Sequence, residues 1–337
     1  METISPVHGT EPSADATPAD GFLSRTMRVT RTAAIVVILA LLLLEIVLRV
    51  MGLASPVLYV DDDATGYRLK PDQKARYLTN AISVNRWGVR DARPLKQKNP
   101  NTKRIVVLGD SVTWGGILLH QQELFTSLLE QALTGTEVIN AGINGYSVAQ
   151  MAQLYRSHLT GLDADTILLF AIPRDFVRPI RVSLVRDSVS FPKRKPLFAL
   201  STALGGALVE LYRRTGWHIL EPAPITHEDS PRLSPPEAVA ENVRELADLA
   251  EAVQGKARLL VVIAPVLSES PAGGPVDTVK DSLAAHAIDF VDLGQNLKAE
   301  PSMFADGVHF SKEGHRRVAE ALAAYLNETM PSEALAE

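Results

Sequence analysis

The stretch "RIVVLGDSVTWG" (Arg104–Gly115) joins an apolar run to a tight polar turn. Its β-branched first half is typical of a buried strand. The Gly109-Asp110-Ser111 turn then places a serine where a strand passes into a helix. Such a turn exposes the hydroxyl and points backbone N–H groups the same way. A Gly-Asp-Ser tripeptide is common by itself, so its weight here comes from the strand before it and from the residues after it.

The same strand-and-helix pattern continues along the chain. Further apolar runs predict strands over residues 137–142, 165–172, 257–266 and 288–293. Helical spacing predicts helices over residues 123–133, 147–159, 236–255, 275–287 and 312–328. Each strand is a continuous apolar run that alternates with helices. This pattern predicts an α/β fold with a mainly parallel five-stranded sheet covered on both faces.

Composition limits the possible functions. The chain has 337 residues and is 46% hydrophobic, enough for one good-sized domain with accessory segments. The net charge of -5 gives no indication of a nucleic-acid partner. The absence of cysteine excludes disulfides, Cys-ligated zinc and a thiol nucleophile. We find neither a metal-ligand cluster nor a phosphate-binding glycine loop, and expect no metal and no cofactor.

The N-terminal region predicts a membrane anchor. Residues 1–30 carry few large apolar side chains, which predicts a disordered tail. Residues 31–54 form an apolar run, interrupted by Glu45 and Arg49, that is long enough for a span of about 20 residues. A buried soluble helix and a cleaved signal peptide are the alternatives. The long preceding region favours an uncleaved, single-pass signal-anchor.

Charge predicts the orientation of this anchor. Arg25, Arg28 and Arg31 precede the span, and few basic residues follow it directly. Basic flanks stay on the cytoplasmic side, so the tail is expected in the cytoplasm. In a bacterium the protein would then lie in the inner membrane, with its main domain in the periplasm.

Three segments are expected after the span. Residues 55–102 are polar and turn-rich and are expected to form a juxtamembrane segment that packs onto the main domain, residues 103–330. Residues 178–234 form a proline-containing insertion with an amphipathic run over 198–214. Long insertions of this kind are uncommon unless they are functional or disordered. A lid over the site, a surface that lies on the membrane, and a surface excursion without a catalytic part all remain open.

Three residues suit nucleophilic catalysis. Serine is a weak nucleophile and needs a base, for which histidine serves best when a carboxylate orients it. Ser111 follows the first strand, while Asp306 and His309 lie three residues apart before the last helix. In an α/β sheet such strand ends meet at one edge. We therefore expect Ser111, His309 and Asp306 to form a triad.

Three blocks of this chain resemble the SGNH (GDSL) hydrolases: "GDSVTWG", "NAGINGYS" (Asn140–Ser147) and "DGVH" (Asp306–His309), within residues 104–326. The resemblance implies a flavodoxin-like three-layer α/β/α sandwich. It makes Ser111 the nucleophile and an oxyanion donor through its backbone N–H, Gly145 a second donor, His309 the base and Asp306 its orienter. Members act mainly on esters, including O-acetyl groups of polysaccharides and acyl chains of lipids. Neighbours of these residues in the blocks, namely Asp110, Asn144 and Trp114, are candidates for substrate contact.

The chain departs from the family pattern at "AIPRD" (Ala171–Asp175). The family's third block ends a strand with an asparagine that is the third oxyanion donor, and here Arg174 stands in its place. In a first reading, Arg174 serves the oxyanion itself, since a guanidinium offers charge-assisted donors. Alternatively, Asn144 or another donor compensates, and Arg174 binds an anionic substrate or pairs with a carboxylate. As a third reading, the site is weakened and binds a ligand without turnover.

Three functions follow from these readings. The first is a membrane-anchored serine esterase that acts through an acyl-enzyme on acyl esters of envelope polysaccharide or lipid. The second is an O-acetyltransferase on an exopolysaccharide, because hydrolysis and transfer share the acyl-enzyme. The third is a carbohydrate-binding or scaffold protein without turnover. The presence of Ser111, His309 and Asp306 together favours an enzyme.

Overall fold

The computed structural model describes residues 18–78, 80–95, 97–179, 187–188, 190–215, 233–267, 270 and 273–329. The chain divides into two compact units, residues 1–47 and residues 48–337.

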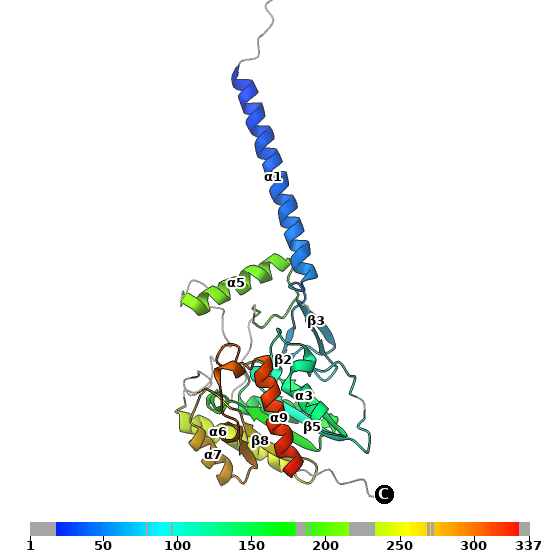
Figure 1. Ribbon diagram of the computed structural model, residues 1–337, viewed down its shortest axis with the longest axis vertical. Coiled ribbons are helices and arrows are strands. Elements are labelled where there is room, and N and C mark those ends of the chain that lie inside the picture. Colours follow the sequence, from blue (N-terminus) through cyan, green and yellow to red (C-terminus); the bar gives the residue numbers. More distant parts are fainter. Residues whose placement is uncertain are drawn as a thin grey trace, which may run out of the picture. The chain divides into compact units, whose positions relative to one another are not determined.

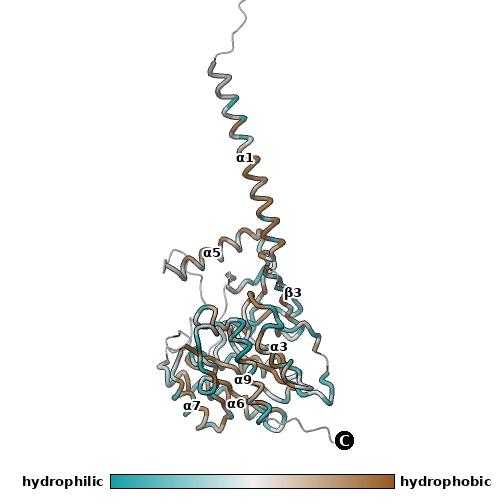
Figure 2. Tube along the Cα trace, in the orientation of Figure 1, coloured by the Kyte–Doolittle hydropathy of each residue, from teal (hydrophilic) through white to brown (hydrophobic). Residues whose placement is uncertain are grey.

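One long helix, α1 (Pro18–Val50), carries the apolar run. Within its segment Arg25–Val50, a stretch of 18 residues reaches a mean hydropathy of 2.8, and the segment is long and apolar enough to cross a membrane. Figure 2 shows this apolar character along the second half of the helix. Because α1 begins at Pro18, residues 18–30 are helical, and the prediction of a disordered tail over residues 1–30 is wrong for them. A helix once nucleated gains one hydrogen bond per added residue, which extends it beyond its apolar part. Residues 1–17 of that predicted tail lie outside the described residues.

Five strands form the main sheet of the second unit (Figure 1). They are β5 (Lys103–Gly109), β6 (Thr136–Gly142), β7 (Thr166–Ala171), β8 (Arg258–Ile263) and β9 (Phe290–Asp292). Their order is β6-β5-β7-β8-β9, and every neighbouring pair is parallel. The strand order reverses between β5 and β7, where ligands bind in such sheets. The predicted α/β class with a five-stranded parallel sheet is confirmed.

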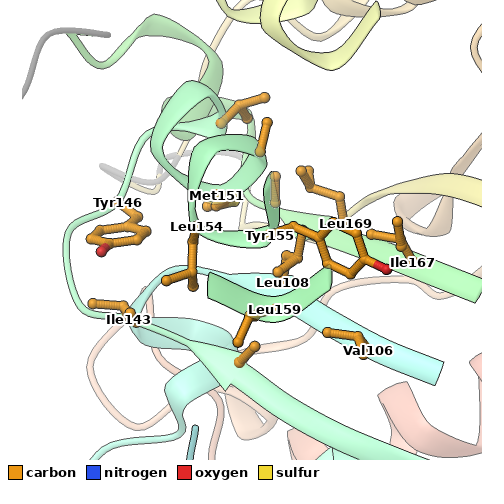
Figure 3. Packing of buried hydrophobic residues seen from close by; sticks show 14 of the residues in the cluster. Val106, Leu108, Ile143, Tyr146, Met151, Leu154, Tyr155, Leu159, Ile167 and Leu169 are labelled. Atoms are coloured by element: carbon orange, nitrogen blue, oxygen red, sulfur yellow. The ribbon is translucent and has the colours of Figure 1, made fainter. Parts of the chain in front are cut away.

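Helices cover both faces of this sheet. On one face are α4 (Val148–Leu154), continued by a π-helical turn at Tyr155–Leu159, α6 (Pro235–Val253) and α7 (Val276–Ala285). On the other are α3 (Phe125–Ala132), the short α8 (Leu293–Asn296) and α9 (Lys312–Thr329). Successive residues of β5 alternate between the two cores, because side chains of a strand point to opposite faces. Figure 3 shows Val106 and Leu108 beneath Met151 and Leu154 of α4.

Two β-hairpins precede the main sheet. They consist of β1 (Tyr59–Asp62) with β2 (Gly66–Leu69), and β3 (Gln73–Tyr77) with β4 (Asn80–Val84). Their inward residues Tyr67, Leu69, Ile82 and Val84 are buried in the same core as α4 and α6. The hairpins therefore contribute to the main hydrophobic core and are more than a link between α1 and the main sheet.

Several 3₁₀ turns and two further helices lie between these elements. A 3₁₀ turn, η4 (Pro173–Val177), follows β7, and others are η1 (Gln121–Glu123), η3 (Thr160–Leu162) and η6 (Pro301–Met303). Within the predicted insertion lies α5 (Ala199–Thr215), where a helix over 198–214 is expected. A single turn of helix, α2 (Ser111–Trp114), follows β5 directly.

Glycines at the ends of β5 and β6 let α2 sit directly on the sheet edge. A Cβ on Gly109 would come within 2.7 Å of the Phe170 carbonyl oxygen and 2.6 Å of Thr113 Cβ. A Cβ on Gly142 would come within 2.8 Å of the Thr113 carbonyl carbon and closer still to the Trp114 backbone nitrogen. At Gly142 these contacts are with the backbone of α2, and at Gly109 they are with the backbone of β7 and the Thr113 side chain, so a Cβ at either position would displace α2 or the sheet edge. The position of Ser111 thus depends on the absence of two side chains.

We predict that Gly142→Ala destabilises the protein by about 2–3 kcal/mol, because the added methyl group overpacks a rigid backbone contact. Gly206→Ala is the matched control, since a Cβ there meets nothing within 4 Å. Denaturant unfolding of the detergent-solubilised full chain measures both. A Gly142→Ala variant as stable as the control would contradict close packing of α2.

Candidate active site

Ser111 begins α2 at the carboxyl end of the central strand β5. The Asp110 side chain caps this helix, because its Oδ1 accepts the backbone N–H of Val112 at 2.8 Å. The Ser111 hydroxyl lies 3.4 Å from Asp110 Oδ2 and is partly accessible. The predicted strand–turn–helix geometry of this serine is therefore present.

His309 and Asp306 reach Ser111 from the loop between η6 and α9. His309 Nε2 lies 2.9 Å from Ser111 Oγ, and His309 Nδ1 lies 2.8 Å from Asp306 Oδ2. The loop is held in shape by Asp306 Oδ1, which accepts the backbone N–H groups of Val308 at 3.1 Å and His309 at 2.8 Å. The structure thus brings the three residues into one continuous chain of hydrogen bonds.

The electrostatics of Asp306 suit a charged partner for His309. Burial raises the pKa of its carboxyl, but hydrogen bonds from the His309 backbone and ring and from Val308 outweigh burial and lower the pKa to about 2. Asp306 is therefore ionised at neutral pH and accepts the proton on His309 Nδ1. That tautomer leaves Nε2 as an acceptor for the Ser111 hydroxyl proton.

Two backbone N–H groups beside the serine are candidate oxyanion donors. Among the described residues, neither the N–H of Ser111 nor that of Gly145 has an acceptor. Gly145 has φ = 77° in the turn that Tyr146 N closes onto the Ile143 carbonyl at 3.4 Å. This left-handed conformation favours glycine strongly. The turn after β6 thus requires glycine for its own geometry as well as for close approach of a substrate.

A cation bridges two buried carboxylates beneath Ser111. Arg178 Nη1 lies 2.7 Å from Asp175 Oδ1, 3.3 Å from Asp110 Oδ2 and 2.7 Å from the Tyr146 carbonyl oxygen. Asp175 is fully buried, and burial together with the nearby Asp110 charge raises its pKa well above the usual value, while Arg178 opposes the rise. Sequence reasoning missed Arg178, because it took this residue as the first of the insertion.

Arg174, the residue at which the chain departs from the family pattern, directly precedes Asp175 in the sequence. Arg174 is exposed at the start of η4, whereas Asp175 next to it is buried. The carboxylates at this edge pair with Arg178, four residues after Arg174. Asp110 and Asp175 are thus paired by a neighbour of Arg174, and the three readings for Arg174 itself stay predictions.

The candidate substrate-contact residues have structural contacts. Asn144 donates from its side-chain amide to the Tyr59 hydroxyl at 2.9 Å, and its carbonyl oxygen accepts from Tyr67 at 2.6 Å. Trp114 is only 2% exposed. Both residues border a cavity of about 580 Å³ between the hairpins and α5. Asp110 serves as helix cap and partner of Arg178.

Arg90, from the segment before the main sheet, fixes the end of α2. Its guanidinium donates to the carbonyl oxygens of Trp114 at 2.6 Å, Gly116 at 2.5 Å and Leu119 at 3.1 Å. It also lies 4.7 Å from the centre of the Trp114 ring. A cation at a helix C-terminus complements the helix dipole. Burial lowers its pKa to about 10, so it stays charged at neutral pH. Sequence analysis gave no signal for Arg90.

Two other histidines have different surroundings. His315 is buried, its Nδ1 accepts the backbone N–H of Phe125 at 3.1 Å, and burial lowers its pKa to about 3. His158 Nε2 lies 2.7 Å from Asp62 Oδ2, a carboxylate at the end of β1 that the sequence did not connect with it. In the described part of the chain, no group of three or more His, Cys, Asp or Glu side chains is arranged to hold a metal ion.

Comparisons with known proteins give structural neighbours only. No family model and no curated protein matches the chain. A lipase/acylhydrolase from Enterococcus faecalis matches 69% of this chain and 100% of its own, with 18% identity and a TM-score of 0.42. A protein described as lipolytic and of the G-D-S-L family, from Desulfitobacterium hafniense, matches 66% and 99%, with 14% identity and a TM-score of 0.38.

A mutant of an acetyl-xylooligosaccharide esterase from Geobacillus matches 70% of this chain and 98% of its own, with 15% identity and a TM-score of 0.39. These neighbours are SGNH/GDSL lipases and acylhydrolases. Their names agree with the family that the sequence blocks resemble. At such identities and TM-scores, however, the function is inferred from the geometry of the site.

We predict that Arg178→Met destabilises the protein by about 3 kcal/mol at pH 8, because it leaves two buried carboxylates without their cation. The deficit should shrink as the pH falls. The pKa of Asp175 is already raised in the folded state, and loss of Arg178 raises it further, so the folded variant binds more protons than the unfolded chain. Its stability therefore falls as the pH rises above 3.8, the ordinary value.

The matched control for this prediction is Arg174→Ala, which removes an exposed arginine four residues earlier and should cost about 1 kcal/mol or less. A double variant, Arg178→Met with Asp175→Asn, should recover part of the loss. Denaturant unfolding between pH 5 and pH 8 tests all three. A deficit that does not depend on pH would rule out the proposed charge balance.

Proposed function

We propose that this chain is a membrane-anchored serine ester hydrolase of the SGNH type. The observation that carries the proposal is the chain of hydrogen bonds from Ser111 Oγ to His309 Nε2 and from His309 Nδ1 to Asp306. A hydroxyl, an imidazole and an ionised carboxylate in this order form the geometry by which a triad is recognised.

The proposed reaction has two halves. Ser111 Oγ attacks the carbonyl carbon of an ester while His309 Nε2 takes the hydroxyl proton. The negative oxygen that forms is stabilised by the N–H groups of Ser111 and Gly145. The tetrahedral intermediate then collapses to an acyl-enzyme, and His309 returns the proton to the leaving alcohol. Water attacks the acyl-enzyme with the same proton transfers and releases the acid.

Arg174 is the proposed third oxyanion donor. It follows β7 at the edge of the sheet that carries Ser111, and its position corresponds to the family's asparagine. An arginine adds a fixed positive charge to a donor that is otherwise neutral. In this proposal Asn144 acts indirectly, by holding the turn that carries Gly145 through its contacts with Tyr59 and Tyr67.

The proposed substrates are O-acetyl or other acyl esters of envelope polysaccharide or lipid. The proposed location is the inner membrane of a bacterium, with α1 as a single uncleaved span and the second unit in the periplasm. The length and hydropathy of Arg25–Val50 support the span, and the basic residues at positions 25, 28 and 31 support the orientation.

We predict that the full chain in detergent hydrolyses a small activated acetate ester, and that Ser111→Ala and His309→Ala lower kcat by about 10⁴-fold or to background. The loss of either residue removes the same proton-transfer step, so the double variant should be no worse than either single one. Ser302→Ala, on an exposed serine close to the same loop, is the control. Equal rates for wild type and Ser111→Ala would favour a binding protein without turnover.

We predict that Arg174→Ala lowers kcat about 100-fold with little change in KM, because an oxyanion donor acts mainly in the transition state. Arg174→Lys should recover part of the rate by keeping the charge. Steady-state kinetics on the same ester gives both parameters. An unchanged kcat would exclude Arg174 from the chemistry, and a change confined to KM would assign it to substrate binding.

A further inference from the structure

Large apolar side chains of α5 and the residues before it face solvent. The exposed fractions are 78% for Leu197, 58% for Phe198, 36% for Leu200, 60% for Leu204 and 47% for Leu211. Figure 2 shows the apolar stretches along this helix. Leu200, Leu204 and Leu211 follow one another at helical spacing, so they share one face. A contiguous apolar surface of this kind marks an interaction site.

The residues of α5 that border the rest of the second unit are small. Thr202, Ala203, Gly206 and Ala207 line the cavity of about 580 Å³ that the helix shares with the hairpins. These are small residues, and a Cβ added to Gly206 would contact nothing within 4 Å. Gly206 and Ala207 are themselves exposed, so these small residues bury little of α5 against its own domain. A helix stabilised by its own domain instead buries its large apolar side chains.

Two observations identify the occupant of the apolar face as a lipid bilayer. The guanidinium of Arg49 donates to the carbonyl oxygen of Leu197, so the apolar segment begins where the candidate membrane helix ends. Arg194 and Lys195, just before Leu197, are exposed. Arg194 is 85% exposed even though it pairs with Asp187 at 3.1 Å. A basic segment joined to an apolar helical face is the pattern of a helix that lies in the membrane interface.

We propose that α5 lies along the surface of the bilayer, with Leu200, Leu204 and Leu211 inserted at the boundary between headgroups and acyl chains. Leu197 and Phe198 extend this contact toward Arg49, and Arg194 and Lys195 face anionic headgroups. The insertion that contains α5 is then a second membrane contact of the second unit. This proposal rests on the proposed anchoring by α1. It adds a second membrane-contacting surface, which a single transmembrane helix does not need.

Because the chain has no cysteine, single cysteines can be introduced and labelled one at a time. A nitrobenzoxadiazole fluorophore is attached to the full chain at Leu204→Cys, at Leu42→Cys in α1, and at Glu251→Cys on the exposed side of α6. The proteins are reconstituted in vesicles of phosphatidylcholine and phosphatidylglycerol. Doxyl-labelled lipids then quench labels within the bilayer, and iodide quenches labels in water.

The proposal predicts that doxyl near the headgroups removes about half or more of the Leu204 fluorescence, while iodide has little effect. The Glu251 label should show the reverse, and the Leu42 label should respond most to doxyl deep in the acyl chains. Placing the Leu204 label in a chain with Phe198→Ser and Leu200→Ser should weaken the lipid quenching. These two substitutions change exposed residues and leave the core intact.

Three outcomes would overturn the proposal. A Leu204 label as accessible to iodide as the Glu251 label would show that the face is not covered. A label shielded from iodide and lipid alike would show that a protein covers it. If Phe198→Ser and Leu200→Ser leave the lipid quenching of the Leu204 label unchanged, these two residues do not contribute to the contact. If the Leu42 label is not quenched by lipid, the proposed anchoring by α1 fails as well, which separates the two failures.

Discussion

The edge of the sheet that carries Ser111 depends on one charge balance, in which Arg178 pairs with both Asp110 and Asp175. Asp110 must be fixed, because its side-chain oxygen Oδ1 accepts the backbone N–H of Val112 in the helical turn that begins with Ser111. Asp175 lies fully buried beside it and accepts the backbone N–H of Ile172 at 3.2 Å. Two carboxylates this close repel each other and lose hydration energy, so neither position is stable without a cation. The ends of β5 and β7 are thereby joined through a residue that touches neither His309 nor Asp306.

The sequence predicted the sheet and the three residues that form the hydrogen-bonded chain, for local reasons. Strand–turn–helix patterning is local around Ser111, and the spacing of Asp306 and His309 is short enough to suggest proximity. The contacts of Arg178 could not be predicted in this way. Its three partners belong to three different segments of the chain. From the sequence alone, Arg174 and Arg178 are equally good candidates to pair with a carboxylate. The 3₁₀ geometry of η4 decides that Asp175 is buried and Arg174 exposed.

The hairpins and Arg90 show a second limit of sequence reasoning. The polar, turn-rich sequence of residues 55–102 predicts a surface segment, and apolar and polar residues alternate only weakly in each short strand. In the structure Tyr59, Tyr67 and Tyr146 form edge-to-face contacts, with ring centres 6.1 Å and 5.2 Å apart. Tyr67 also donates to the Asn144 carbonyl oxygen, beside Gly145. Arg90 holds the far end of α2. The segment before the main domain therefore supports both turns that carry the proposed oxyanion donors.

The chemical class of the proposed enzyme follows from Ser111, His309 and Asp306 more than from the third donor. Loss of one oxyanion donor costs about 3–4 kcal/mol in the transition state, whereas loss of the serine or its base removes the covalent route altogether. In the proposed enzyme, replacement of the family's asparagine by Arg174 is therefore expected to change the rate or the preferred substrate before it changes the reaction. A guanidinium at this edge also favours an anionic group near the acyl carbon, which a neutral amide does not. In the proposed enzyme, Arg174 is therefore expected to influence which ester is cleaved, while the hydrogen-bonded chain through His309 is expected to decide whether any ester is cleaved.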